Sequence, residues 1–303
     1  MIKQMLISLI LISSITLCLG TTKEVNAAET ITNINTNLNQ IGEYYYKNNL
    51  AGTTMNSMYE LYEKPQSVSS KANLDFDPNS YNFKLKQSVP KLIYIGDNKF
   101  SNTTNTDQSY VTTSYSKAVT HEVSTATTKG FNLNGQGLEF KLPLFIGSNT
   151  ITASFNSGTT ETNTETTTET ITSGAQTVNV PANKTFKVIV SLEEFTFNGT
   201  LDYKANGTNL YNDITAKGMW IDRWGTPYTK TYNFHESVGS EWNNLNSEQK
   251  ASIKEIKINP SNNSMTVEGS AEITGTLGTR MIVKTYDITD GEYKLVRTQV
   301  IEL

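Results

Sequence analysis

Residues 130–155 read GFNLNGQGLEFKLPLFIGSNTITASF, and apolar and polar side chains alternate along both halves of this stretch. Alternation with a period of two is typical of β-strands, because successive side chains point to opposite faces. The stretch therefore predicts a β-hairpin with one apolar face and one polar face. Each half has about the length that a tilted strand needs to cross a bilayer.

We place this hairpin at residues 129–156 and expect its two faces to carry different residues. The alternation changes phase at Gly135-Gln136-Gly137, which predicts a β-bulge there. The apolar face is predicted to contain Phe131, Leu133, Leu138, Phe140, Leu142, Ile151, Ala153 and Phe155. The polar face is predicted to contain Asn132, Asn134, Glu139, Lys141, Thr150, Thr152 and Ser154. The tip is predicted to consist of Pro143, Leu144, Phe145, Ile146 and Gly147.

Polar segments rich in Thr, Ser and Asn flank the hairpin on both sides, at residues 101–128 and 156–177. The most biased part, residues 160–170, reads TETNTETTTET. Low hydrophobicity is often a sign of disorder. However, Thr is β-branched and favours strands, and Gly and Pro are sparse within both segments. We therefore predict two long, solvated strands that pair with each other.

Two folds explain a hairpin with one apolar face. In a β-sandwich the apolar face packs on a core. In a transmembrane β-barrel it faces lipid, while the polar face lines a wet lumen. A sandwich strand has no evident reason to continue into polar runs on both flanks, whereas a barrel that extends into water does. The flanking segments therefore favour the barrel.

The segment after residue 27 begins with a different periodicity. Apolar residues recur every three or four positions, which predicts two amphipathic helices. The first contains Ile31, Ile34, Leu38, Ile41 and Tyr45, and the second contains Met55, Met58, Tyr59 and Tyr62 and ends at Pro65. Most of the remaining chain alternates with a period of two, so we expect it to be mainly strand.

Composition narrows the cellular setting. Residues 1–27 have the features of a signal peptide, with Lys3, an apolar run at residues 5–19 and a small-residue site before residue 28. The only cysteine, Cys18, lies in that run, so the mature chain is expected to be secreted without a thiol. A net charge of −4 and a pI near 5.4 argue against nucleic acid as a partner.

The sequence gives little reason to expect catalysis. It has only two histidines, His121 and His235, and neither a His-Glu-x-x-His nor a Gly-x-Ser-x-Gly motif. We therefore expect no catalytic residues, no metal site and no cofactor.

Several segments resemble the epsilon-toxin and mosquitocidal-toxin branch of the aerolysin-like β-pore-forming toxins. Besides the Thr-rich strands and the apolar hairpin, these are residues 180–183 (VPAN), which precede an alternating strand, and residues 278–284 (GTRMIVK). The likeness covers most of residues 100–303. It implies a mainly β, elongated fold of long antiparallel strands, with a small α-helical N-terminal head and a C-terminal β-sandwich.

The resemblance also implies a division of the chain and a set of partners. Residues 28–100 would form a receptor-binding head with residues 205–245 packing near it, residues 101–180 the long strands with the insertion hairpin, and residues 181–303 the sandwich. The partners would be a target-cell membrane, a surface receptor of protein or glycan, and further copies of the chain, usually seven. Receptor contacts are expected from exposed aromatic residues, namely Tyr44, Tyr46, Trp220, Trp224 and Tyr228. Tyr45, Tyr59 and Tyr62 lie on the helical stripes and are expected in the core.

The sequence therefore favours a secreted, non-enzymatic toxin that inserts one hairpin per copy into a shared transmembrane barrel. The alternative is a secreted β-sandwich adhesin or lectin-like protein without pore activity, which would explain the aromatic residues and the Thr content but not the apolar tip. A secreted hydrolase is the third reading.

Overall fold

The computed structural model describes residues 30–146 and 149–302. The predicted signal peptide lies outside the described residues. The helices are α1 (Ile34–Asn49), α2 (Val238–Asn243) and α3 (Ser247–Ser252). The strands are β1 (Thr30–Asn33), β2 (Thr54–Met55), β3 (Tyr59–Leu61), β4 (Ser67–Gln87), β5 (Lys91–Ser101), β6 (Gln108–Val111), β7 (Tyr115–Leu133), β8 (Gln136–Gly137), β9 (Glu139–Ile146), β10 (Asn149–Asn156), β11 (Asn163–Ser173), β12 (Thr177–Val180), β13 (Thr185–Ile221), β14 (Pro227–Ser237), β15 (Ile256–Asn259), β16 (Ser264–Asp287) and β17 (Lys294–Glu302).

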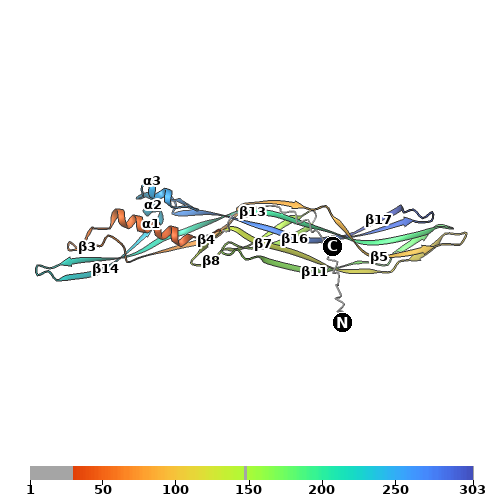
Figure 1. The fold of residues 1–303 in the computed structure, drawn as a ribbon, viewed down its shortest axis with the longest axis horizontal. Helices are drawn as coiled ribbons and strands as arrows, with labels where there is room; N and C mark the ends of the chain where they lie inside the picture. The colour runs from red at the N-terminus through yellow and green to blue at the C-terminus, as the bar shows by residue number, and fades with distance from the viewer. Residues whose placement is uncertain (1–29, 147–148, 303) are drawn as a thin grey trace, which may run out of the picture.

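The molecule is a long rod, and strand β13 is its spine (Figure 1). At about 3.3 Å per residue, its 37 residues reach roughly 120 Å. Buried and less buried side chains alternate along most of β13, so one face of the strand contacts core for nearly its whole length. Strand β16 pairs with β13 in antiparallel register from Phe186↔Asp287 to Gly207↔Met265.

The two Thr-rich segments form neighbouring strands, as predicted. Strand β11 pairs with β7 in antiparallel register from Asn163↔Thr125 to Ser173↔Tyr115. Hydroxyls also meet across the pair, with Ser116 Oγ 2.8 Å from Thr172 Oγ1. β-Branched, hydrogen-bonding side chains suit a sheet surface in water, so these segments are ordered despite their low hydrophobicity.

The described residues form three apolar cores along the rod. The largest lies under the hairpin formed by β9 and β10, and contains Phe197, Leu201 and Leu277 from the main sheet. A second contains Val188, Val190 and Met281 from the part of the sheet nearer β17, and a third lies in the head around Tyr46 and Ile214. The hairpin is a separate two-stranded sheet that covers one face of the main sheet.

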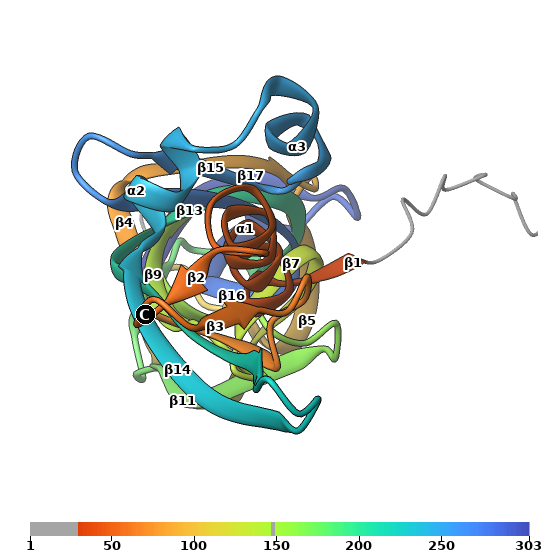
Figure 2. The ribbon, with the colours of Figure 1, turned by 90° about the vertical axis from the view of Figure 1, so that its left-hand side faces the viewer.

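The head is built around α1, which Figure 2 shows end-on among β2, β3, α2 and α3. The side chain of Asn33 caps the helix by accepting a hydrogen bond from Asn35 N (3.0 Å), and Ile34, Leu38 and Ile41 are buried. The first predicted helix is therefore confirmed over Ile34–Asn49, while Ile31 belongs to β1.

The second predicted helix is wrong. Its residues form the short hairpin of β2 and β3, where Met55 pairs with Tyr59. Asn56 and Ser57 both have positive φ (50° and 59°), a backbone conformation that a helix does not allow. The spacing of Met55, Met58 and Tyr59 fits a helix equally well, because the segment is too short for periodicity alone to separate the two structures.

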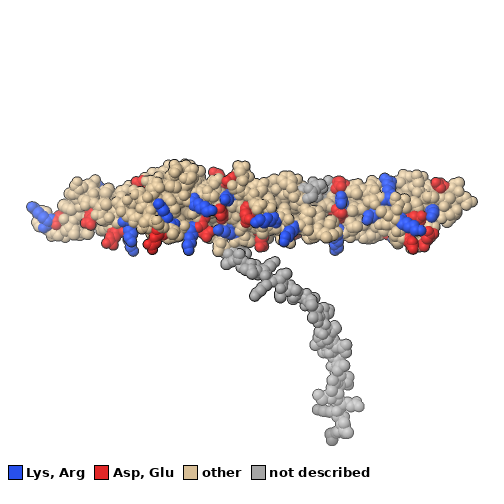
Figure 3. Space-filling view, turned by 90° about the horizontal axis from the view of Figure 1, so that it is seen from above, with Lys and Arg blue, Asp and Glu red and all other residues tan. Residues whose placement is uncertain are grey.

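The expected fold class is confirmed, since the chain is mainly β with one large sheet and few helices. Acidic and basic side chains are interspersed along the face shown in Figure 3. Within residues 30–146 and 149–302, no helix has the length and apolar character needed to cross a membrane.

Candidate functional site

The hairpin of β9 and β10 presents its apolar row to the body of the protein. Across the pair, Phe140 faces Phe155, Leu142 faces Ala153, and Leu144 faces Ile151. Most of these side chains are buried and belong to the largest core; Phe140 and Ile151 are half-buried at its margin. The apolar face predicted from the sequence is thus the face that packs on the sheet in this conformation.

The tip differs from the sequence prediction. Residues 143–146 continue strand β9, with Leu144 and Ile146 buried and Phe145 72% exposed. Pro143 lacks an N–H, but the described part of β9 pairs only with β10, so the strand has a free edge that tolerates proline. Gly147, the last predicted tip residue, lies outside the described residues.

The first half of the predicted hairpin is divided between two elements. Phe131 and Leu133 end strand β7, and the chain then reverses at Asn134 and Gly135 (φ 53° and 77°) into β8. Positive φ at two consecutive residues makes a tight hairpin turn, so the predicted bulge at residues 135–137 is wrong. Leu138 is half-buried beyond β8. In this conformation the hairpin therefore covers residues 139–156 rather than 129–156.

Aromatic rings hold the hairpin on the sheet. The ring of Phe140 stacks on Phe76 of β4 at 4.3 Å and on Phe155 at 5.3 Å, and it lies 4.9 Å from Tyr203 of β13. Tyr203 also contacts Phe131 at 6.0 Å. Burial raises the pKa of the Tyr203 phenol to about 12, which keeps the ring neutral.

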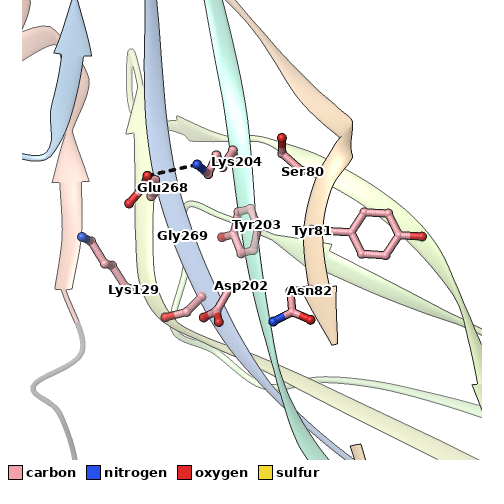
Figure 4. A pocket seen from close by; sticks show the side chains of 10 residues that line it. Ser80, Tyr81, Asn82, Lys129, Asp202, Tyr203, Lys204, Glu268 and Gly269 are labelled. Carbon is pink, nitrogen blue, oxygen red and sulfur yellow. Dashed lines mark ion pairs between the residues drawn. The ribbon is translucent and has the colours of Figure 1, made fainter. Parts of the chain in front are cut away.

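A hollow of about 450 Å³ lies over Tyr203 on the surface of the sheet. Figure 4 shows Tyr81 and the ion pair of Lys204 with Glu268 (3.4 Å) at its sides. Lys257 also pairs with Glu268, at 2.9 Å, so these charges are satisfied within the protein. The hollow therefore offers no unpaired charge for a ligand.

Backbone and hydroxyl groups close the base of the hairpin. The fully buried Ser157 hydroxyl donates to the carbonyl oxygen of Phe131 (2.8 Å) and accepts from Leu138 N (2.8 Å). Ser157 O accepts from Phe131 N (2.8 Å). Gly137 and Gly158 meet here, where a Cβ on Gly137 would lie 2.3 Å from Gly158 N. No larger residue fits without moving the backbone.

Two threonines of β7 attach the hairpin along its second strand. Thr125 Oγ1 donates to Ser154 O (2.7 Å), and Thr127 Oγ1 donates to Asn156 O (2.8 Å). The described main sheet makes no ladder pairing with β9 or β10. The hairpin is thus attached by side chains and by contacts at its base.

The predicted polar face is largely in water. Lys141, Thr150, Thr152, Glu139 and Asn134 are exposed, and Asn132 and Ser154 are half-buried. Lys141 Nζ lies 4.0 Å from Glu165 Oε1, and the Ser154 hydroxyl donates to the same carboxylate. Glu165 of β11 therefore links the polar face of the hairpin to the Thr-rich strands.

The predicted receptor contact at Tyr46 is contradicted. Tyr46 is 0% exposed, and its hydroxyl donates to Tyr62 O (2.7 Å) inside the head. The buried stripe of α1 follows Leu38, Gly42 and Tyr46 at four-residue steps in its last turns. Tyr44 is half-buried with its hydroxyl 3.1 Å from Ser252 Oγ, and Tyr45 is also half-buried.

The other three aromatic candidates meet at the hairpin that joins β13 to β14. Trp220 and Tyr228 face each other across the strands with ring centroids 5.3 Å apart. Trp224 lies in the turn and is 74% exposed. The structure therefore brings Trp220 and Tyr228 into contact and places Trp224 in the turn of the same hairpin, at the end of the head.

Acidic and basic side chains are spread along the described part of the chain. No three His, Cys, Asp or Glu side chains there gather in a group that could hold a metal ion. Glu241 of α2 is fully buried, and burial raises the pKa of its carboxyl to about 8, although a hydrogen bond from Asn212 lowers it. No sequence pattern indicates this buried carboxyl, because Glu241 lies in a polar segment.

Comparison with known proteins identifies one family and several similar folds. Residues 72–295 match the sequence model of the Clostridium epsilon toxin ETX/Bacillus mosquitocidal toxin MTX2 family. No curated protein matches the chain.

The solved structures with a similar fold include the following three. The Mpp75Aa1.1 β-pore-forming protein from Brevibacillus laterosporus is 19% identical with a TM-score of 0.55, over 90% of this chain and 96% of that chain. A non-toxic crystal protein from Bacillus thuringiensis is 15% identical with a TM-score of 0.59, over 88% and 98%. The Cry23Aa1 and Cry37Aa1 binary protein complex includes a chain that is 18% identical with a TM-score of 0.51, over 90% and 96%. At these identities the likeness shows a shared fold.

Proposed function

The chain belongs to the Clostridium epsilon toxin ETX/Bacillus mosquitocidal toxin MTX2 family and has an aerolysin-like toxin fold, and from this premise we propose a function for it. The protein is secreted, binds the surface of a target cell, associates with further copies, and inserts one β-hairpin per copy into the membrane. The inserted hairpins form a transmembrane β-barrel pore. The mechanism is physical, and no covalent bond is made or broken.

The observation that carries the proposal is the attachment of the hairpin. The β9–β10 sheet makes its backbone ladder only within itself, so it can leave the body without breaking a strand pairing of the described main sheet. Before insertion, the apolar row of the hairpin is buried against the body of the protein. No backbone ladder holds it there. Transfer of that row into lipid keeps it out of water, and ring closure pairs the two free strand edges.

In the pore, we propose that the apolar row faces lipid and the polar row faces the lumen. Leu142, Leu144, Ile146 and Ala153 lie on the first of these rows, and Lys141, Thr150 and Thr152 on the second. The Phe131 and Leu133 end of β7 joins the hairpin only if the Asn134–Gly135 turn opens. A barrel strand extended to residue 129 therefore requires a change of conformation at that turn.

The fold alone does not decide whether a protein forms pores, because one protein of the same fold is described as non-toxic. Dye release from liposomes or cells therefore tests the proposal. A cysteine pair at Thr125 and Ser154 is chosen to lock the hairpin, because the Thr125 hydroxyl donates to the main-chain carbonyl of Ser154 (2.7 Å) and the two residues are therefore neighbours on β7 and β10. Mass spectrometry verifies the disulfide before any leakage is measured. We expect the oxidised protein to release no dye and the reduced protein to release it. The oxidised single-cysteine variants Thr125→Cys and Ser154→Cys are the controls. Equal leakage from the verified disulfide form and the reduced form would remove the hairpin from the mechanism.

A further inference from the structure

The end of the head carries an apolar patch with a carboxylate at its centre. There β2, β3, β13 and β14 lie side by side, and Thr54, Glu60 and Met219 stand in one row across the first three strands. Side chains two positions along a strand share its face. Ile221 therefore shares the face of Met219 on β13, while Met58, in the turn before β3, and Tyr62, directly after β3, line the same hollow as Glu60.

This patch is hollowed. A cavity of about 650 Å³ lies over it, and Glu60, Met58, Tyr62, Met219 and Ile221 are among the residues that line it. Met58 is 48% exposed and Ile221 is 54% exposed. Large apolar side chains grouped in a surface hollow are typical of a binding site rather than of a plain surface.

Two carboxylates of the hollow are unpaired. Neither Glu60 nor Glu63 forms an ion pair with any residue in 30–146 and 149–302, although Lys217 stands on the same face beside Tyr62. A purely apolar ligand would bury the Glu60 carboxylate without a partner, which is costly. A small hydrated cation would leave the apolar ring uncovered. A cation with alkyl substituents satisfies both parts, and Tyr62 adds an aromatic face for it.

The neighbouring turn indicates where such a cation comes from. Asp222 Oδ1 accepts hydrogen bonds from Trp224 N (2.9 Å) and Thr226 N (2.8 Å), so the turn is fixed with Trp224 pointing into water. The Arg223 guanidinium lies 4.0 Å from the centre of the Trp224 ring. Trp side chains are enriched at the headgroup level of membranes, which suits an exposed Trp at this position. This turn forms one extreme end of the rod (Figure 1).

We propose that the hollow around Glu60 binds the quaternary ammonium group of a choline phospholipid, with Trp224 seated in the membrane interface beside it. This inference rests on the proposed function, because it supplies the first contact of the head with a target membrane. The rod then extends away from the membrane surface. Its head lies nearest to the lipid, and the core under the hairpin lies farther from it.

Co-sedimentation of the full chain with vesicles tests the site without requiring a pore. We expect binding to phosphatidylcholine vesicles, and binding weaker by about tenfold or more to vesicles rich in phosphatidylethanolamine at the same ionic strength, because the methyl groups are lost. The double variant Glu60→Gln/Glu63→Gln should lose about tenfold or more in affinity for phosphatidylcholine vesicles, since a charge-assisted contact disappears. Glu292→Gln, an exposed carboxylate in the loop before β17 without an ion pair among the described residues, is the matched control and should bind as the parent does.

Several outcomes overturn the inference. The first is equal binding of the parent to both vesicle types, and the second is unchanged binding of the Glu60→Gln/Glu63→Gln variant. The third is binding to cells, but not to phosphatidylcholine vesicles, that is lost when the cells are treated with protease. Free choline can also saturate the hollow, followed through the fluorescence of Trp220 in a Trp224→Phe/Trp242→Phe background. Saturation with no effect on vesicle binding would assign the hollow to a soluble cation instead. Choline-dependent binding without dye release leaves this inference intact and counts against the pore. Dye release that does not depend on the lipid headgroup supports the pore and counts against this inference.

Discussion

Ser157 is the residue on which the base of the hairpin depends most directly. Its buried hydroxyl bridges Phe131 O and Leu138 N, both at 2.8 Å. Ser157→Ala leaves two buried backbone groups without partners, at a cost of about 1–3 kcal/mol in the free energy of unfolding. We also expect faster dye release, because the hairpin separates more easily. Urea unfolding and leakage rates measure the two effects. Ser116→Ala, which removes an exposed hydroxyl, is the control, and an equal loss of stability in both variants would contradict the prediction.

Glu241 should make the stability of the protein depend on pH. Its carboxyl has an ordinary pKa of 4.5 in the unfolded chain, whereas burial, assisted by the negative charge of Glu236, raises the folded pKa to about 8. The folded state therefore binds more protons between these values. The free energy of unfolding should fall as pH rises from about 4.5 to 8, by at most about 1.4 kcal/mol per pH unit, and level off above that.

The measurement is urea unfolding across pH 5 to 9, compared with Glu241→Gln. The variant keeps the volume and a polar group facing Asn212, but it has nothing to ionise, so its slope over this range should be flatter. Parallel curves for the two proteins would show that Glu241 ionises normally. This effect belongs to a single residue of the head and should leave the contacts of the hairpin unchanged.

At the scale of elements, the aromatic contacts between β4 and the hairpin should set how readily the hairpin leaves. Phe76 stacks on Phe140 at 4.3 Å from the body side, so Phe76→Ala weakens docking without changing the inserting sequence. We expect a loss of up to about 3 kcal/mol in stability together with faster dye release. Phe100→Ala removes a similar stack, with Tyr110 at 5.1 Å, beside the second core around Val188 and Met281. It should cost stability without speeding release, and equal acceleration by both variants would contradict the docking role.

The elements that could be predicted from the sequence are those with long, regular patterns. The alternation of residues 139–156 and the Thr-rich arms located the hairpin, β7 and β11, because many residues repeat the same signal. The β2–β3 hairpin was missed since it has too few residues for periodicity. The turn after β7 does have a local signal, because Asn134-Gly135 is the pair that favours a type I′ turn. Placing Gly135 in a bulge at residues 135–137 and Asn134 on the polar face misses this signal and extends the first half of the hairpin too far.

The burial of Tyr46 could not be derived from the sequence. Three successive tyrosines on a helix point in three different directions. Which of them is buried depends on the segments that pack against the helix. Tyr46 is buried because its hydroxyl finds Tyr62 O, a partner supplied by a segment that was expected to be helical. The arrangement of Trp220, Trp224 and Tyr228 likewise follows from the pairing of β13 with β14.

At the scale of the whole molecule, the sheet of the described residues has two edges without a strand partner at the end opposite the head. Strands β5, β13, β16 and β17 lie in this order, and each neighbouring pair is antiparallel. An even number of alternating strands makes β5 and β17 run in opposite directions. Copies related by rotation about an axis along the strands can therefore place β17 of one beside β5 of the next in antiparallel pairing.

This geometry gives a test of the proposed association of copies. Tyr94 of β5 and Val300 of β17 are exposed, and the register across the sheet places both at the height of Ser191 and Ile282. Tyr94→Lys combined with Val300→Lys puts a positive charge on each edge and should abolish the detergent-resistant oligomer and dye release, because like charges and solvated lysines block edge pairing. The melting temperature of the monomer should stay close to that of the parent, since both side chains are exposed. Tyr94→Lys removes the hydrogen bond from the Tyr94 hydroxyl to Asp97 (2.8 Å), but a lysine there can pair with the same carboxylate. Val111→Lys, at an exposed position on β6, is the control and should assemble normally. Oligomers that form unchanged in the double variant would assign the contact between copies to another surface.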